Sequence, residues 1–390
     1  MAEKYDRQAW ITLIFCNLAA LCLGTVYIWG VYQPFVMEHF SYTSHQASQT
    51  FSVTLAALVA GSILGGKLQE KAEPQKVIGL GGVLYAVGAF LAGLQLSMRP
   101  LYLYATFGAL CGLGMGMIYT SILTCSQRWF RNRRGFVMGL IAGSMGLGGV
   151  VFVPVSQFFL QNFGVRQNFF FYAVLFLFVF AVCAAFVKNP PVPAQENAGR
   201  QNDLLPRDML RHKSFYLLCG AFFLAAPAYL LVTPHLNALG AERGLGAENL
   251  AAAVMTASLF NVAGRLITTF LSKKTGRENM VIALTLITAL ATALLLFAKG
   301  WGFVLAASVI SFCYGGYHGI FPVLTSGHFG VKNAGENYGY VLIGFGLSAS
   351  LTPLLFGPSQ TGYGPALALA AGFSVLAAVF LFLLKRNGKN

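Results

Sequence analysis

Charged side chains are the scarcest class in this 390-residue sequence. They make up 10% of the chain, whereas hydrophobic residues make up 56%. A soluble domain carries about 25% charged residues, so this deficit excludes an ordinary water-soluble fold. Apolar runs of roughly 20 residues, long enough to cross the hydrocarbon of a bilayer, recur along the whole sequence. The composition therefore predicts an all-α membrane protein embedded in a lipid bilayer.

Motifs for catalysis and metal binding are also missing. The seven cysteines all fall inside apolar runs, and none has the CxxC spacing of a zinc or redox site. Glycine patterns such as GLGMG lie within apolar runs and do not follow a strand, so we interpret them as packing glycines. No nucleotide-binding loop or nucleophile–base pair is recognisable. The sequence predicts no enzyme, no bound metal and no cofactor.

Breaks between the apolar runs divide the chain into predicted transmembrane helices. A polar stretch that contains NPPVP separates two sets of six. We therefore expect an N-terminal six-helix bundle in residues 1–188, a cytoplasmic linker in 189–213 and a C-terminal six-helix bundle in 214–390. The twelve predicted helices are 10–36, 45–66, 76–97, 101–125, 135–160, 168–187, 215–236, 248–271, 280–298, 302–326, 338–356 and 365–384.

Basic residues are distributed unevenly between the predicted loops. With the N-terminus inside, the outer loops hold only Arg99, Arg166, Arg243 and Lys299. This asymmetry follows the positive-inside rule, and it accounts for the net charge of +14 without a nucleic-acid partner. We expect a multi-pass protein of the cell inner (plasma) membrane with both termini in the cytoplasm.

The two sets of six helices resemble each other in sequence. VYQPF at the end of the first helix parallels LVTPH at the end of the seventh, and AGSILGGKLQEK parallels AGRLITTFLSKK. RRGFVMGLIAGSMGLGG is similar to NYGYVLIGFGLSAS, and the matches keep one order. Such duplication is typical of transporters that bind substrate at midplane between two bundles. The sequence thus predicts two pseudo-symmetric six-helix bundles.

One basic residue, Arg265, lies within an apolar run. It precedes Lys273, where the next cytoplasmic loop starts, by eight residues, or roughly 12 Å of helix, which places it near the bilayer midplane. A charge there costs roughly 2.5–3.5 kcal/mol on insertion scales, and arginine does not escape by deprotonating. All twelve acidic residues fall in loops or at helix ends. Two readings stay open: bonds to backbone carbonyls or snorkelling, and the favoured one, a mobile carboxylate held by the guanidinium fork.

Other side chains at similar depth are candidates for the same site. Asn261 precedes Arg265 by one helical turn and shares its face. Each aromatic is also compatible with plain packing, and for His235 a helix-end role is the favoured reading over gating or proton transfer. The predicted binding residues are Arg265, Asn261, Tyr119, Tyr317, His318, Phe321, Phe345 and Tyr27, with His235 and Glu242 as weaker candidates for gating or proton coupling.

The motifs resemble those of a known family. GTVYIWGVYQPF, GLGMGMIYTSILTCSQRWFRNRRGFVMGLIAGSMGLG, FNVAGR and HFGVKNAGENYGYVLIGFG are similar to the major facilitator superfamily, in the branch of monocarboxylate transporters and oxalate/formate antiporters. The resemblance implies that Arg265 binds a carboxylate and that Asn261, Tyr119 and Tyr317 line the site. The family's loop signature, roughly GxxxDRxGRR, is degraded to GGKLQEKAEPQK, with Glu70 and Lys71 at its Asp-Arg positions.

Several functions are compatible with these observations. The favoured one is secondary transport of a small, lactate-like monocarboxylate, coupled to a proton, by alternating access of a monomer. An oxalate-type antiporter is expected, by resemblance, to carry a second cation in the eleventh helix, and residues 338–356 contain no lysine or arginine. If a proton is carried, His318, His235, Glu242 or the bound anion itself would carry it. The alternatives are an organic anion exchanger and a carboxylate sensor that does not transport.

Overall fold

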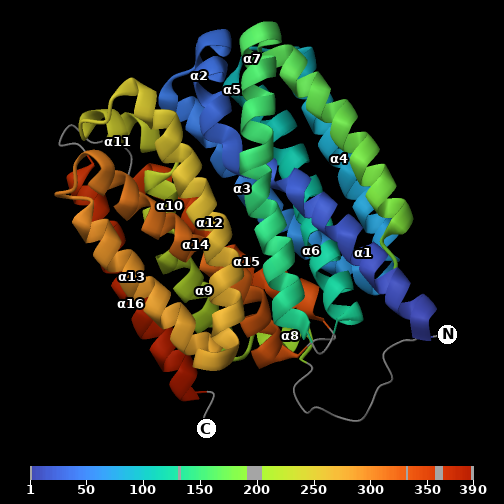
Figure 1. Cartoon of the computed structure of the whole chain (residues 1–390). Coiled ribbons are helices and arrows are strands. Elements are labelled where there is room, and N and C mark those ends of the chain that lie inside the picture. The colour runs from blue at the N-terminus through green and yellow to red at the C-terminus, as the bar shows by residue number, and fades with distance from the viewer. Residues whose placement is uncertain (1, 131–132, 191–203, 331–332, 356–362, 388–390) are drawn as a thin grey trace.

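The computed structural model describes residues 2–130, 133–190, 204–330, 333–355 and 363–387. All regular elements in these ranges are helical. Long helices run roughly side by side, and the two ends of the chain lie at the same end of the molecule (Figure 1). We call this end the basic end, because α3, α12 and α16 finish there with lysines or arginines in their last turns.

The first half of the chain forms one bundle of helices. Three consecutive segments take the place of the first predicted helix, and α7 takes the place of the fifth and sixth. The elements are α1 (Ala2–Leu23), η1 (Gly24–Ile28), α2 (Trp29–Phe40), α3 (Ser44–Lys71), α4 (Pro74–Leu94), α5 (Pro100–Leu103), η2 (Tyr104–Cys111), α6 (Gly112–Trp129) and α7 (Arg134–Phe186).

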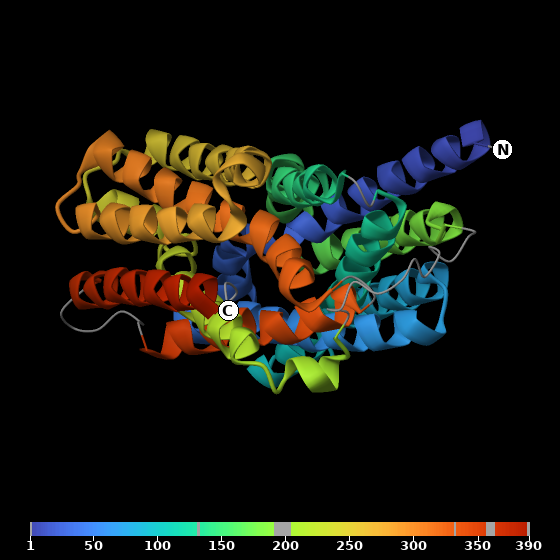
Figure 2. The same ribbon diagram turned by 90° about the horizontal axis from the view of Figure 1, so that it is seen from below.

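The second half forms the other bundle. Its elements are α8 (Pro206–Met209), α9 (Lys213–Ala225), α10 (Pro227–Val232), α11 (Leu236–Glu242), α12 (Ala247–Thr275), α13 (Arg277–Leu294), α14 (Gly300–Phe329), α15 (Ala334–Leu355) and α16 (Gly364–Asn387). The greater part of the predicted linker, residues 191–203, lies outside the described residues. Seen from the basic end, the yellow-to-red second half lies beside the blue-to-green first half (Figure 2).

Ten helices among the described residues are long and apolar enough to cross a membrane. One of them, α7, is 53 residues long and covers two predicted spans, with a kink at Gly164, whose φ is +82°. Only glycine adopts this conformation at little cost. The predicted loop between 160 and 168 is therefore wrong in extent, because a single residue turns the chain. With α15 at 22 residues, the helices account for all twelve predicted spans.

The seventh predicted helix, 215–236, is interrupted. Proline at position 227 has no amide hydrogen, and its ring clashes with the carbonyl four residues before it. The chain therefore breaks between α9 and α10, which end at Ala225 and begin at Pro227. The short α11 follows, beyond the predicted limit. This break brings Tyr229, in α10, into the interior, where it is buried.

Two helix pairs join the halves through close contacts. A Cβ on Gly66 of α3 would lie 2.7 Å from the Cα of Glu336 in α15, and one on Gly146 of α7 would lie 2.9 Å from Val262 of α12. Such small residues allow backbones to approach where no hydrophobic force acts between helices. The α7–α12 contact holds Arg265 at the junction between the halves.

Candidate functional site

Arg265, on α12, is completely buried at this junction. Its Nε donates to Oδ1 of Asn261 at 2.9 Å, one turn earlier on the same helix. Its Nη1 donates to the carbonyl oxygen of Ala142 on α7, in the other half, at 3.0 Å. Its Cζ lies 5.0 Å from the ring centroid of Tyr27, also in the first half, within range of a cation–π contact. The guanidinium therefore touches both bundles.

Several buried polar atoms around this arginine have no hydrogen-bond partner among the described residues. They include Nη2 of Arg265 and Nδ2 of Asn261. An unpaired buried donor costs about 1–3 kcal/mol. In the described part of the chain, the one ion pair joins Glu278 and His328, so Arg265 has no carboxylate partner there. The site offers donors to an acceptor that none of the described residues supplies.

Tyrosines from five elements surround the guanidinium. The charge of Arg265 interacts with the hydroxyls of four of them, and the ring of the fifth, Tyr27, faces it. The rings of Tyr229 and Tyr314 stack at 3.6 Å between centroids, and those of Tyr119 and Tyr338 lie 6.4 Å apart. We call Tyr27, Tyr119, Tyr229, Tyr314 and Tyr338 the tyrosine cluster.

Sequence reasoning found two members of the tyrosine cluster and missed three. Tyr314 could have been predicted as a site residue from the sequence, because it precedes His318 by one helical turn and so lies on the same face of the helix. Tyr338 opens the eleventh predicted span, and Tyr229 follows the break at Pro227. Their positions depend on how whole helices pack, and no local pattern shows this.

Tyr317, predicted to line the site, points its hydroxyl elsewhere. The oxygen lies 2.7 Å from Oγ1 of Thr288 on α13, inside the second bundle. The structure gives its ring one aromatic neighbour, Phe321, at 6.5 Å. The hydroxyl is thus paired within one half, whereas the hydroxyl of Tyr338 interacts with Tyr119 of the other half.

The other predicted aromatic residues form a wall beside the tyrosine cluster. His318 lies with its ring 4.4 Å from Tyr314 and 5.1 Å from Phe345. Its Nδ1 is 3.3 Å from the carbonyl oxygen of Tyr314. Phe321 stacks on Phe222 at 4.2 Å, and Phe222 in turn lies 5.5 Å from Phe345. These rings come from α9, α14 and α15 and are all buried.

The remaining predicted residues lie away from Arg265. His235 pairs its Nδ1 with the carbonyl oxygen of Leu231 at 3.0 Å, and its ring lies 5.4 Å from Tyr363. Glu242 is exposed at the end of α11, and Glu70 and Lys71 are exposed where α3 ends. None of these four has a described contact with the guanidinium.

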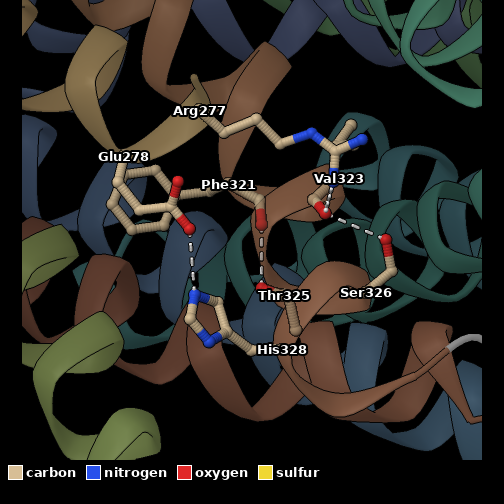
Figure 3. A network of polar contacts seen from close by, with 7 residues as sticks. All are labelled: Arg277, Glu278, Phe321, Val323, Thr325, Ser326 and His328. Atoms are coloured by element: carbon tan, nitrogen blue, oxygen red, sulfur yellow. Dashed lines mark hydrogen bonds and ion pairs between the residues drawn. The ribbon is translucent and has the colours of Figure 1, made fainter. Parts of the chain in front are cut away.

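A second polar cluster lies at the basic end of the second half (Figure 3). Glu278 pairs with His328 at 3.2 Å, and Arg277 donates to the carbonyl oxygen of Val323 at 3.1 Å. A cavity of about 600 Å³ is lined by these charged residues together with Lys273. The charges in Figure 3 have partners supplied by the protein, so this cluster lacks the unpaired donors that surround Arg265.

Comparison with known proteins gives the same fold. The model of the Major Facilitator Superfamily matches residues 14–353. The structure of the proton:xylose symporter XylE bound to 6-bromo-6-deoxy-D-glucose aligns with a TM-score of 0.75, at 14% identity, over 97% of this chain and 96% of that chain.

Two of the relatives that resemble the chain in sequence carry names that describe a substrate. The oxalate:formate antiporter of Oxalobacter formigenes is 27% identical over 399 residues, which cover 97% of this chain and 92% of the antiporter. Monocarboxylate transporter 13 of Bos taurus is 28% identical over 250 residues, which cover 64% of this chain and 57% of that transporter. With the family model matching most of its length, the chain belongs to the Major Facilitator Superfamily of membrane transporters.

Proposed function

We propose that this protein transports small monocarboxylates, with Arg265 binding the carboxylate. The observation that carries the proposal is the free Nη2 of a fully buried guanidinium, with the free Nδ2 of Asn261 beside it. A carboxylate accepts hydrogen bonds from such donors and neutralises the charge at the same time. The names of both relatives, an oxalate:formate antiporter and a monocarboxylate transporter, agree with this ligand class.

A single charge on the substrate matches the single fixed cation of the site. Residues 338–356 contain no lysine or arginine, so a second carboxylate would find no cation on this helix. The hydroxyl of Tyr338, which interacts with Tyr119 across the junction, is a suitable partner for a hydroxyl or keto oxygen next to the carboxylate. A short 2-hydroxy acid such as L-lactate therefore fits best.

The contacts of Arg265 with both halves support alternating access. Its hydrogen bond to Ala142 joins α12 to α7, and a bound anion would compete for the same guanidinium. In this proposal a monomer with bundles at 1–188 and 214–390, joined by the linker 189–213, rocks around the anion. The basic end faces the cytoplasm of a plasma membrane, as the loop charges indicate. A proton crosses with the anion.

Uptake by reconstituted protein tests the proposal. Proteoliposomes would receive labelled L-lactate under an inward proton gradient, with the Arg265→Ala protein alongside. We expect uptake that follows the gradient and is lost in the variant. Gradient-driven uptake that persists in Arg265→Ala would overturn the role of the arginine.

Anion exchange is the second candidate, because the oxalate:formate antiporter is similar over nearly the whole chain. Exchange requires an anion inside the vesicle, whereas symport does not. Uptake that appears only after loading with internal formate or lactate would establish exchange. Binding with no uptake under either condition would indicate a carboxylate sensor.

A further inference from the structure

The imidazole of His318 is held in one orientation beside the candidate site. His318 lies on α14 and is only 5% exposed. Its Nδ1 is 3.3 Å from the carbonyl oxygen of Tyr314, one turn earlier on the same helix. Its ring centroid lies 4.4 Å from that of Tyr314, 5.1 Å from that of Phe345 and 5.3 Å from that of Phe222. One hydrogen bond and three ring contacts therefore fix the orientation of the imidazole.

Two glycines of α14 bring this ring to the depth of Arg265. A Cβ on Gly315, three residues before His318, would lie 3.2 Å from Cγ of Arg265. A Cβ on Gly319, the residue after His318, would lie 3.0 Å from the carbonyl oxygen of Arg265. The charge of Arg265 also acts on the imidazole. A carboxylate bound to the guanidinium therefore brings its neighbouring carbon close to His318.

The hydrogen bond of Nδ1 determines which nitrogen of the ring carries the proton. A carbonyl oxygen only accepts, so Nδ1 of His318 is the donor. The ring stays neutral, because a second positive charge would be buried beside Arg265 and no described carboxylate pairs with either group. In a neutral imidazole with a proton on Nδ1, the other nitrogen is an acceptor. Nε2 of His318 therefore presents a lone pair.

No described residue donates a hydrogen bond to that lone pair. Nδ1 bonds back to α14, and the two nitrogens lie on different sides of the ring, so Nε2 points away from the backbone of its own helix. Phe222 and Phe345, which pack on the ring, have no side-chain donor. An unpaired buried acceptor costs about 1–3 kcal/mol. The site thus offers an acceptor beside the free donor of Arg265.

We propose that His318 determines specificity by accepting a hydrogen bond from a hydroxyl on the carbon next to the substrate carboxylate. The inference rests on the proposed function and narrows its substrates to 2-hydroxy acids. The hydroxyl of Tyr338 donates equally well to a hydroxyl or a keto oxygen, so it does not distinguish them. Nε2 of His318 does, because a keto oxygen has no proton to donate and would face the lone pair. The site therefore favours L-lactate over pyruvate.

Equilibrium binding of four acids to the purified full-length protein tests the role of His318. The acids are L-lactate, pyruvate, (S)-2-fluoropropionate and propionate. Fluorine takes the place of the hydroxyl without a proton to donate, and propionate measures what the carboxylate contributes alone. Wild type should bind L-lactate about tenfold more tightly than pyruvate or (S)-2-fluoropropionate, because only lactate satisfies the acceptor.

Two substitutions on α14 separate the acceptor from the shape of the site. His318→Phe keeps an aromatic ring against Tyr314, Phe222 and Phe345 but removes both nitrogens, so the preference for L-lactate over (S)-2-fluoropropionate should fall below about twofold. Propionate bound by this variant shows that its site is folded. Tyr317→Phe is the matched control, because its hydroxyl pairs with Thr288, and it should keep the tenfold preference.

The protonation of His318 is measurable without any substrate. Nitrogen NMR of protein with isotope-labelled histidine, in lipid nanodiscs, distinguishes the two neutral tautomers from the charged ring. The chain has six histidines, and the signals that disappear in His318→Phe belong to His318. We expect a proton on Nδ1 and none on Nε2.

Any of three results would overturn the role of His318. They are equal binding of L-lactate and (S)-2-fluoropropionate by wild type, a preference that survives in His318→Phe, and a proton on Nε2. Wild type that binds none of the four acids would overturn the proposed function together with this inference. Binding of all four acids without preference would overturn the inference alone.

Discussion

The same helix pair is built twice in this protein, once in each half. In the first half, a Cβ on Gly61 of α3 would overlap the carbonyl oxygen of Leu113, which follows Gly112, the first residue of α6. In the second half, a Cβ on Gly264 of α12 would overlap the carbonyl oxygen of Phe312 on α14. Both pairs therefore need glycine at the equivalent place, because the backbones are in direct contact.

A second pair of equivalent glycines lies on the partner helices, α6 and α14. A Cβ on Gly116 of α6 would overlap the carbonyl oxygen of Leu58, and one on Gly315 of α14 would overlap that of Asn261. The backbones of the two halves are thus alike at the level of single contacts. This pseudo-symmetry is what the parallel sequence stretches predict.

The side chains at the equivalent positions differ sharply. Ser62 of α3 directs its hydroxyl to the carbonyl oxygen of Gly116, at 3.4 Å, and stays within its own half. Arg265, its counterpart on α12, reaches Ala142 in the other half and keeps a free donor. The two halves share a backbone scaffold, and the proposed binding chemistry comes from a side chain, Arg265, that only the second half carries at this position.

We expect the largest difference in substrate affinity when Arg265 and Ser62 are each replaced by alanine. Arg265→Ala should weaken L-lactate binding by at least about 30-fold, since loss of one partner of a buried charge pair costs roughly 2–5 kcal/mol. Ser62→Ala should leave affinity unchanged, because the serine contacts no part of the proposed site. Equilibrium binding to purified protein measures both. Equal losses of affinity in the two variants would contradict the proposed functional difference between the halves.

The glycine contacts should be equivalent in the two halves. Gly116→Ala and Gly315→Ala would each place a Cβ against backbone that does not move easily, and overpacking of this kind costs about 1–3 kcal/mol. Thermal unfolding in detergent should show a similar loss of stability for both. Gly372→Ala of α16 is the control, because a Cβ there meets nothing within 4 Å. A large loss for only one of the pair would contradict the structural repeat.

The smallest expected effect distinguishes two tyrosines of the second half. Tyr338→Phe should lose about 0.5–1.5 kcal/mol of lactate binding, because its hydroxyl is proposed to contact the substrate. Tyr317→Phe should bind as wild type does, because its hydroxyl pairs with Thr288. Titration of both variants measures the difference. A loss of affinity in Tyr317→Phe alone would instead support the sequence-based prediction that Tyr317 lines the site.

The sequence predicts those features that depend on residues close together in the chain. Apolar runs mark the helices, because a bilayer admits few other structures, and Asn261 was paired with Arg265 by helical spacing alone. The break at Pro227 also had a local cause that the predicted single helix ignored. What the spacing did not determine is the rotation of one helix against another. That rotation turns Tyr314 toward Arg265 and Tyr317 toward α13.

Contacts between helices that are distant in the chain could not be predicted from the sequence either. Glu336 reads as an ordinary loop carboxylate in the sequence, but it is buried in the structure, where Gly66 lets α3 approach α15. Both halves of the junction have to be in place before this carboxylate is buried.

The central claim is that the missing counter-charge of Arg265 is the substrate. The most direct test compares binding of L-lactate with that of L-lactamide, an uncharged analogue of similar shape, to wild type and to Arg265→Met. The account predicts that wild type binds lactate and rejects lactamide, and that this discrimination disappears in the variant. Equal binding of the two ligands by wild type, or discrimination that survives in Arg265→Met, would contradict it.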